Sequence, residues 1–177
     1  MKQMVLDIGV ATGPSLASFL AGPNEAVLQH LQIWASERAG AAHRSPVPCY
    51  LWGTSGSGKT HLLKAVREAL REQGERVGWL DASVLAPPEF DEAWSAVMLD
   101  DVHLYNAEQQ HTAFNWFVNA QSLQRAVLAA GDRPPADLLL RDDLRTRLGW
   151  GHVFGLQVLS EPERRAVLRQ AADARGV

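Results

Sequence analysis

The sequence has little that would place the chain in a membrane or in an oxidising compartment. It contains one cysteine, Cys49, so no disulfide can form within the chain. No stretch approaches the roughly 18 consecutive apolar residues that a membrane-spanning helix needs. The N-terminal sequence MKQMVLDIGV lacks the apolar core and the cleavage site of a signal peptide. We therefore expect a cytoplasmic protein that makes no contact with membranes.

An excess of positive charge is also missing. The chain has 17 Lys and Arg residues against 20 Asp and Glu residues, which gives a formal net charge of −3. Because a domain that binds nucleic acid directly usually carries a basic excess, we expect any contact with DNA to be indirect. All basic residues after residue 124 are arginines, the side chain best suited to a bidentate grip on phosphate or carboxylate.

What the sequence does contain is the composition and patterning of one globular domain. Its 177 residues are 46% hydrophobic and 21% charged, which suffices for a single core. Short apolar segments alternate with segments of helical periodicity, and this alternation is typical of an α/β fold with a parallel sheet between helices. The predicted strands are 49–52, 77–80, 96–99, 126–130 and 153–158, and the predicted helices are 24–39, 59–73, 107–122, 142–148 and 161–174.

The strongest motif follows the first predicted strand. Residues 53–60 read GTSGSGKT and match G-x-x-x-x-G-K-S/T, the P-loop pattern. Glycines let backbone N–H groups wrap phosphates, Lys59 would reach the β- and γ-phosphates, and Thr60 would offer its hydroxyl to Mg²⁺. We therefore expect a site for ATP or ADP with Mg²⁺. Its predicted residues are Gly53, Thr54, Ser55, Gly56, Ser57, Gly58, Lys59 and Thr60.

Two carboxylates follow another predicted strand. In AVMLDD (96–101), Asp100 stands at the end of a buried strand, where a Walker B aspartate holds Mg²⁺ through water. Asp101 could then polarise the attacking water. Two acids after an apolar run are more often a turn with solvated charges, but the preceding P-loop favours the metal-site interpretation here.

Two clusters of acidic and basic residues come later in the chain. AAGDRPP (129–135) puts Asp132 and Arg133 at the C-terminal edge of a parallel strand, where open α/β sheets bind ligands. A tight turn fixed by the two prolines is the simpler alternative. LRTRLGWG (144–151) carries Arg145 and Arg147 near the end of a short helix. Because positions two apart do not share a helix face, at most one of these arginines can point at a given target.

Taken in this order, the P-loop, the DD strand end, DRPP and RxRLxWG resemble the AAA+ core of the DnaA family of bacterial replication initiators. The segment FLAGPN resembles the adenine-pocket segment of that family, which implies nucleotide contacts from Phe19, Leu20 and Asn24. The resemblance covers residues 17 to about 170. Within the family, ASFLAGPN, GDRPP and LGWGHVFGLQVLS are most similar to the Hda type, which inactivates DnaA after replication has started and lacks the initiator's DNA-binding domain.

The resemblance implies a fold and a role for particular residues. The fold would be a P-loop NTPase of the AAA+ type with about five parallel strands. Asp132 would be the first sensor, close to the γ-phosphate, and Arg147 would be an arginine finger that completes a neighbouring subunit's nucleotide site. In the Hda type this finger acts on ATP held by DnaA. The chain would then be a co-catalyst, with weak or no ATPase activity of its own.

The resemblance also implies partners. Hda-type proteins bind the DNA-loaded sliding clamp, the β subunit of DNA polymerase, through an N-terminal peptide of the form Q-x-x-L-x-L/I/F. Gln3, Leu6 and Ile8 in QMVLDI fit this pattern, and apolar side chains at this spacing suit docking of a peptide in a groove. A disordered terminus or an edge strand covering the sheet is the alternative. The expected partners are DnaA, the sliding clamp and a second copy in a homodimer.

The AAA+ pattern continues into a helical lid that closes over the nucleotide, whereas this sequence stops at Val177, after what would be the first lid helix. We expect a tail with the clamp peptide at 1–16, the nucleotide-binding core at 17–159, and the first helix of a largely absent lid at 160–177.

Two other classes of function stay open. A DnaA-like initiator or helicase-loader core would bind DNA directly, with a steep dependence on salt. A small P-loop kinase has a similar length and a similar P-loop, but DRPP and RxRLxWG have no role in such an enzyme.

Overall fold

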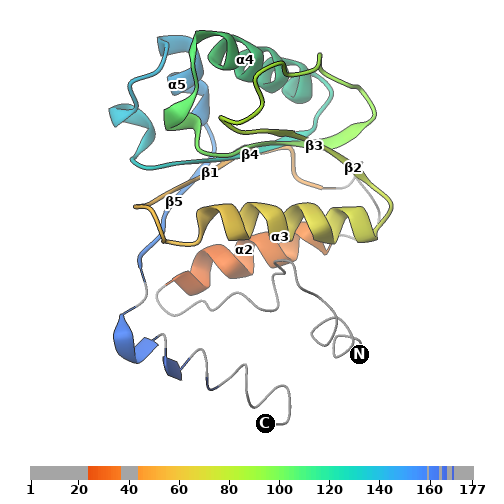
Figure 1. Ribbon diagram of the computed structural model, residues 1–177. Coiled ribbons are helices and arrows are strands. Elements are labelled where there is room, and N and C mark those ends of the chain that lie inside the picture. The colour runs from red at the N-terminus through yellow and green to blue at the C-terminus, as the bar shows by residue number, and fades with distance from the viewer. Residues whose placement is uncertain (1–23, 37–43, 159, 164, 167–168, 170–177) are drawn as a thin grey trace.

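The computed structural model describes residues 24–36, 44–158, 160–163, 165–166 and 169 (Figure 1). The strands are β1 (Cys49–Trp52), β2 (Arg76–Leu80), β3 (Trp94–Leu99), β4 (Ala126–Gly131) and β5 (His152–Gly155). The helices are α2 (Glu25–Ala35), α3 (Lys59–Glu72), α4 (Ala107–Ser122) and α5 (Asp142–Leu148), with short 3-10 helices η3 (Val102–Leu104) and η4 (Pro135–Asp137). Within this described part, no helix combines the length and apolar character needed to cross a bilayer.

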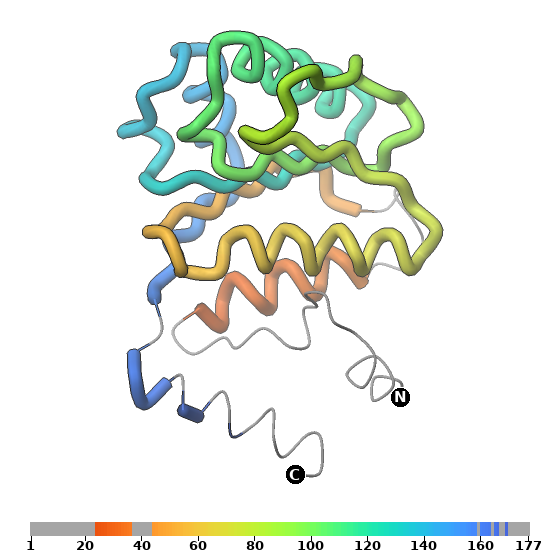
Figure 2. The backbone as a smooth tube through the Cα atoms, viewed as in Figure 1, coloured from red at the N-terminus to blue at the C-terminus, as the bar shows by residue number. Residues whose placement is uncertain are grey.

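The five strands form one parallel sheet in the order β2-β3-β4-β1-β5. Helices α4 and α5 cover one face, and α2 and α3 cover the other, as Figures 1 and 2 show. The prediction of an α/β fold with a five-stranded parallel sheet between helices is therefore confirmed.

Because both faces of the sheet are buried, the strand sequences consist mostly of consecutive apolar residues. All six residues of β4 are buried. Successive side chains of a strand point to opposite faces, so in β1 Tyr50 joins the core under α4 and α5, whereas Leu51 joins the core against α2 and α3. Trp116 and Phe117 of α4 anchor the first core, and both are at most 1% exposed.

Two strand boundaries differ from the prediction. Strand β3 begins at Trp94, two residues before the predicted start, because the Trp94 ring is buried with its centroid 4.7 Å from that of Trp116. Strand β5 ends at Gly155 and not at residue 158. Beyond it, the backbone N–H and C=O of Gln157 bond to the side chain of Asn24 and no longer to a neighbouring strand.

Two helix boundaries also need comment. Helix α2 spans Glu25–Ala35, and the Ser36 N–H still bonds to the Gln32 carbonyl; residues 37–39 of the predicted helix lie outside the described residues. Most of the helix predicted at 161–174 lies outside the described residues, although residues 161–163, 165–166 and 169 are helical.

Candidate functional site

The predicted site residues come from three strands that lie next to one another. The P-loop follows β1, Asp100 follows β3, and Asp132 follows β4, which lies between those two strands. Because the strands are parallel, their carboxyl ends share one edge of the sheet, and this edge is where open α/β sheets bind ligands.

The backbone of the P-loop requires its glycines. Gly56 and Gly58 have φ values of 88° and 98°, a region that other residues rarely adopt. Gly53 needs its lack of a side chain for a different reason, because a Cβ there would lie 2.7 Å from Ser57 Oγ and 2.9 Å from the Leu156 carbonyl oxygen. The loop leads directly into α3, so the unpaired N–H groups of that helix face the loop, as an anion site requires.

Lys59, the first residue of α3, is buried within this loop. Its ammonium group donates to the carbonyl oxygens of Gly53 and Thr54 at 2.6 and 3.0 Å. Burial lowers the pKa of Lys59, and the nearby carboxylates, with Asp101 the strongest, act in the opposite direction. The positive charge is thus held inside the loop by neutral acceptors, and no carboxylate among the described residues bonds to it.

Thr60 and Asp100 form a direct contact between the P-loop helix and β3. The Thr60 hydroxyl donates to Asp100 Oδ2 at 2.7 Å. The other carboxylate oxygen, Oδ1, is buried and accepts no hydrogen bond from the described residues. Burial raises the pKa of Asp100, partly offset by the Thr60 hydrogen bond.

This pair of side chains fits a divalent cation that is bound jointly with phosphates. A hydroxyl and a carboxylate with an unused buried oxygen are donors that Mg²⁺ prefers. Among the described residues, no group of three or more His, Cys, Asp and Glu side chains could hold a metal ion. Phosphate and water oxygens would therefore have to complete the coordination.

Asp101 lies beside Asp100 but in different local structure. It precedes η3 with φ 50° and ψ 48°, the left-handed region that Asp tolerates better than most residues. Its carbonyl accepts the Leu104 N–H at 2.9 Å. The predicted role for Asp101 in activating water stays a prediction.

Asp132 is held by its neighbour at the end of β4. Arg133 Nε and Nη2 donate to the two Asp132 carboxylate oxygens at 2.9 and 3.0 Å, and this grip lowers the pKa of Asp132. The Tyr50 hydroxyl fixes the same turn by donating to the Arg133 carbonyl at 2.6 Å. His103 also approaches, with its buried Nδ1 3.9 Å from Asp132 Oδ1. The sequence offered no local signal for His103, which follows an acidic pair and has no ligand-like spacing.

Asn24 is the described member of the predicted adenine-pocket segment, since Phe19 and Leu20 lie outside the described residues. It is 4% exposed, and its amide group forms two hydrogen bonds of 2.9 Å, donating to the Gln157 carbonyl and accepting the Gln157 N–H. Next to Gln157, the Leu156 N–H donates to the Trp52 carbonyl at 2.7 Å, directly before the P-loop. Through these bonds, Asn24 holds the segment after β5 next to the P-loop. The predicted clamp peptide, Gln3, Leu6 and Ile8, also lies outside the described residues.

The two arginines of α5 point to different surroundings, as their spacing predicts. Arg145 pairs with Asp142 at 2.5 Å. The Arg147 guanidinium carbon lies 4.4 Å from the centroid of the Trp150 ring and 5.2 Å from that of Phe114. Within the described part of the chain, Arg147 forms no hydrogen bond or ion pair through its side chain. The contribution of the two rings was not predicted from the sequence, in which both residues resemble ordinary core positions.

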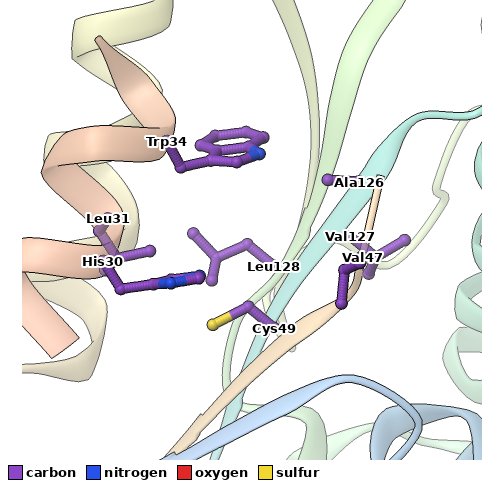
Figure 3. Close-up of a pocket in the computed structure, with 8 residues that line it drawn as sticks. All are labelled: His30, Leu31, Trp34, Val47, Cys49, Ala126, Val127 and Leu128. Atoms are coloured by element: carbon purple, nitrogen blue, oxygen red, sulfur yellow. The ribbon is translucent and has the colours of Figure 1, made fainter. Parts of the chain in front are cut away.

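A small hollow of about 20 Å³ lies at the opposite edge of the sheet, between α2 and the first residues of β1 and β4 (Figure 3). The Cys49 thiol lies there, opposite His30 and Trp34. Burial raises the pKa of this thiol to about 12, so the group stays protonated and inert near neutral pH. The hollow is separate from the strand ends that carry the P-loop.

The five-stranded parallel sheet between helices has the fold of P-loop NTPases of the AAA+ type. Residues 14–86 match the family model described as the bacterial DnaA ATPase domain. Over this segment, the chain is therefore similar to the DnaA ATPase domain.

Solved structures show the same fold. Domain III of DnaA from Thermotoga maritima aligns with a TM-score of 0.71 at 21% identity, over 92% of this chain and 74% of that one. AMPPCP-bound DnaA from Aquifex aeolicus gives a TM-score of 0.72 at 21% identity, over 90% of this chain and 55% of that one. RuvB from Thermotoga maritima gives 0.62 at 20% identity, over 92% and 54%. The chain thus spans about half the length of the larger proteins that it matches.

Proposed function

We propose that this protein is a cytoplasmic regulator of replication initiation that promotes hydrolysis of the ATP bound to DnaA, together with the DNA-loaded sliding clamp. The observation that carries the proposal is the state of Arg147. Arg147 stands within RxRLxWG, at the position where an arginine finger is expected. No described residue accepts a hydrogen bond from its side-chain N–H groups, whereas Arg145 on the same helix forms an ion pair with Asp142. A cation with unused donors is the group that a phosphate on a partner would require.

The chain's own site binds ATP or ADP with Mg²⁺ in this proposal. The P-loop amides and the buried Lys59 ammonium would contact the phosphates, and Thr60 with Asp100 would hold the cation. When bound, Mg²⁺ neutralises negative charge on the phosphate oxygens. Support comes from the orphaned buried oxygen of Asp100 and from the AMPPCP complexes among the matched DnaA structures.

Arg147 acts on a second nucleotide site, the one in DnaA. A guanidinium that reaches the transferring phosphoryl group neutralises charge in the transition state, an effect worth roughly 10³–10⁵ in rate. Asp132 and Asp101 would serve the chain's own site, where hydrolysis is weak or absent. Gln3, Leu6 and Ile8 would dock on the clamp and so raise the concentration of Arg147 near DnaA on DNA.

The test follows radiolabelled ATP on DnaA in the presence of clamp loaded on DNA. The wild type should accelerate conversion to ADP, and both Arg147→Ala and a triple alanine variant of Gln3, Leu6 and Ile8 should fail. Arg145→Ala is the matched control, because it removes an arginine from the same helix whose donors are already occupied. An active Arg147→Ala variant would reject the finger, and a silent wild type would reject the proposal as a whole.

Direct DNA binding is the second candidate, because one of the matched DnaA structures is bound to single-stranded DNA as well as AMPPCP. Binding to duplex and to single-stranded DNA at two salt concentrations separates the two functions. A DNA-binding core would show affinity that falls steeply between about 50 and 200 mM salt. The regulator should bind neither form of DNA without the clamp.

A further inference from the structure

Arg147 belongs to a row of alternating guanidinium groups and aromatic rings, which we call the aromatic ladder: Arg141, Phe114, Arg147 and Trp150. Arg141 Cζ lies 5.3 Å from the Phe114 centroid, and Arg147 Cζ lies 5.2 Å from the same centroid. Trp150 follows, 4.4 Å from Arg147. All three distances are within the range of attraction between a cation and a ring face.

Both rings are held by the fold. Phe114 projects from the long helix α4 and is half-buried against the core under α4 and α5. Trp150 is 56% exposed, but its backbone is fixed by the end of α5, where the Gly149 N–H bonds to Thr146 and the Trp150 N–H bonds to Arg147. Because it is exposed, Trp150 does not pack in the hydrophobic core. The described contact of its ring with a cation is the one with Arg147.

The arginines of this segment differ in whether their side-chain N–H groups form hydrogen bonds. Arg141 donates two hydrogen bonds of 2.7 Å to the Asp143 carboxylate, and Arg145 donates to Asp142. Arg147 makes no such bond with the described residues, and its guanidinium lies over rings. A ring covers the flat face of a guanidinium and leaves the N–H groups in the plane available. Arg147 is therefore fixed in place without losing its donors.

We propose that Phe114 and Trp150 are positioning residues for Arg147. They hold its guanidinium in one orientation at the end of α5, so that its N–H edge meets a phosphoryl group of a partner without first losing side-chain freedom. Since a preformed orientation matters most at the reacting phosphate, the rings act on the maximal rate rather than on partner affinity. This inference rests on the proposed function of Arg147.

The experiment measures hydrolysis of DnaA-bound ATP over a range of concentrations of this protein, with Phe114→Leu and Trp150→Leu. Each should lower the maximal rate roughly three- to tenfold, since a cation–ring contact of moderate strength is lost, with the half-saturating concentration unchanged. The variants Phe114→Tyr and Trp150→Phe keep an aromatic ring, so their maximal rates should lie within about twofold of the wild-type rate. Arg145→Gln is the control, because Arg145 lies outside the ladder. In NMR spectra, the Arg147 Hε resonance should be shifted upfield by the rings and should move back in Trp150→Leu.

The outcomes separate the inference from the proposed function. If Arg147→Ala abolishes stimulation while both leucine variants match the wild type, the positioning role is wrong and the finger stands. If the leucine variants change only the half-saturating concentration, the rings are contacts with the partner, and the positioning role is again overturned. If Arg147→Ala has no effect, the proposed function fails and the inference fails with it.

Discussion

The Thr60 hydroxyl and the Asp100 carboxylate meet at 2.7 Å, although they are separated by 40 positions in the sequence and by β4 in the sheet. The contact fixes one oxygen of Asp100 and leaves the other buried without a partner among the described residues. An ionised carboxylate in this condition is costly to bury, and a cation would relieve the cost. Asp100 therefore lowers the stability of the folded protein while one of its oxygens stays free of hydrogen bonds from the described residues.

Replacing Asp100 by Asn should stabilise the nucleotide-free protein and abolish its response to Mg²⁺-ATP. Burial raises the pKa of Asp100 above the ordinary value of 3.8. The protonated group favours the folded state, so this stability is fully present below about pH 3.8 and is lost as pH rises through the raised pKa. Asn carries no charge to bury and can still accept the Thr60 hydrogen bond.

Thermal unfolding of both proteins between pH 4 and 7 measures this effect. The gain in Tm of Asp100→Asn should grow with pH and amount to a few degrees, since 1 kcal/mol corresponds to about 2–4 °C in a domain of this size. Adding Mg²⁺-ATP should raise the Tm of the wild type alone. A variant less stable than the wild type at pH 7 would contradict the argument.

Lys59→Met should weaken nucleotide binding while leaving the fold intact. The substitution keeps the apolar stem and deletes the ammonium group that now contacts the Gly53 and Thr54 carbonyls. Loss of a buried charge that faces phosphate should weaken ATP binding roughly 30-fold or more, as measured by calorimetry. Lys64→Met, on the same helix, is the matched control and should bind as the wild type does.

Asn24→Ala should destabilise the domain through backbone groups far away in the sequence. It removes two partly buried hydrogen bonds to the N–H and C=O of Gln157, each worth about 0.5–1.5 kcal/mol. Asn24→Asp should be at least as harmful, because a carboxylate accepts the N–H but repels the carbonyl. Chemical denaturation measures both, and wild-type stability in Asn24→Asp would show that the reciprocal pair contributes nothing.

The Cys49 thiol should be unreactive in the folded protein. With its pKa raised to about 12, the thiolate fraction at pH 8 is roughly one in ten thousand. A thiol reagent such as Ellman's should therefore label the native protein slowly and release one equivalent quickly in denaturant. Because the chain has a single cysteine, this reaction reports opening of the sheet edge near α2 without ambiguity.

Local patterns predicted the parts of the structure that are local. Apolar segments and helical spacing predicted α4 and α5 with their observed bounds, and the P-loop motif predicted the glycine-rich loop between a strand and a helix. The contact between Thr60 and Asp100 could also be anticipated, since parallel strands bring their ends to one edge.

Contacts between segments that are far apart in the sequence could not be predicted from local patterns. No sequence pattern near Asn24 predicts its hydrogen bonds to Gln157, a residue 133 positions further along the chain. These bonds take the place of strand pairing at Gln157, so β5 ends earlier than predicted. Trp150 resembles the other tryptophans in sequence, but Trp94 and Trp116 are buried while Trp150 covers an arginine. Such outcomes depend on tertiary packing and not on the residue's neighbours in the chain.

The pair formed by Asn24 and Gln157 has an architectural consequence. It holds the N-terminal end of α2 beside the segment that follows β5, so two segments far apart in the sequence are fastened together. Because the pair fixes the spacing of these two segments, residues 24 and 157 could be joined by a short linker without altering any strand crossing. The exposed turn at Gly74, between α3 and β2, is a natural position for the new termini.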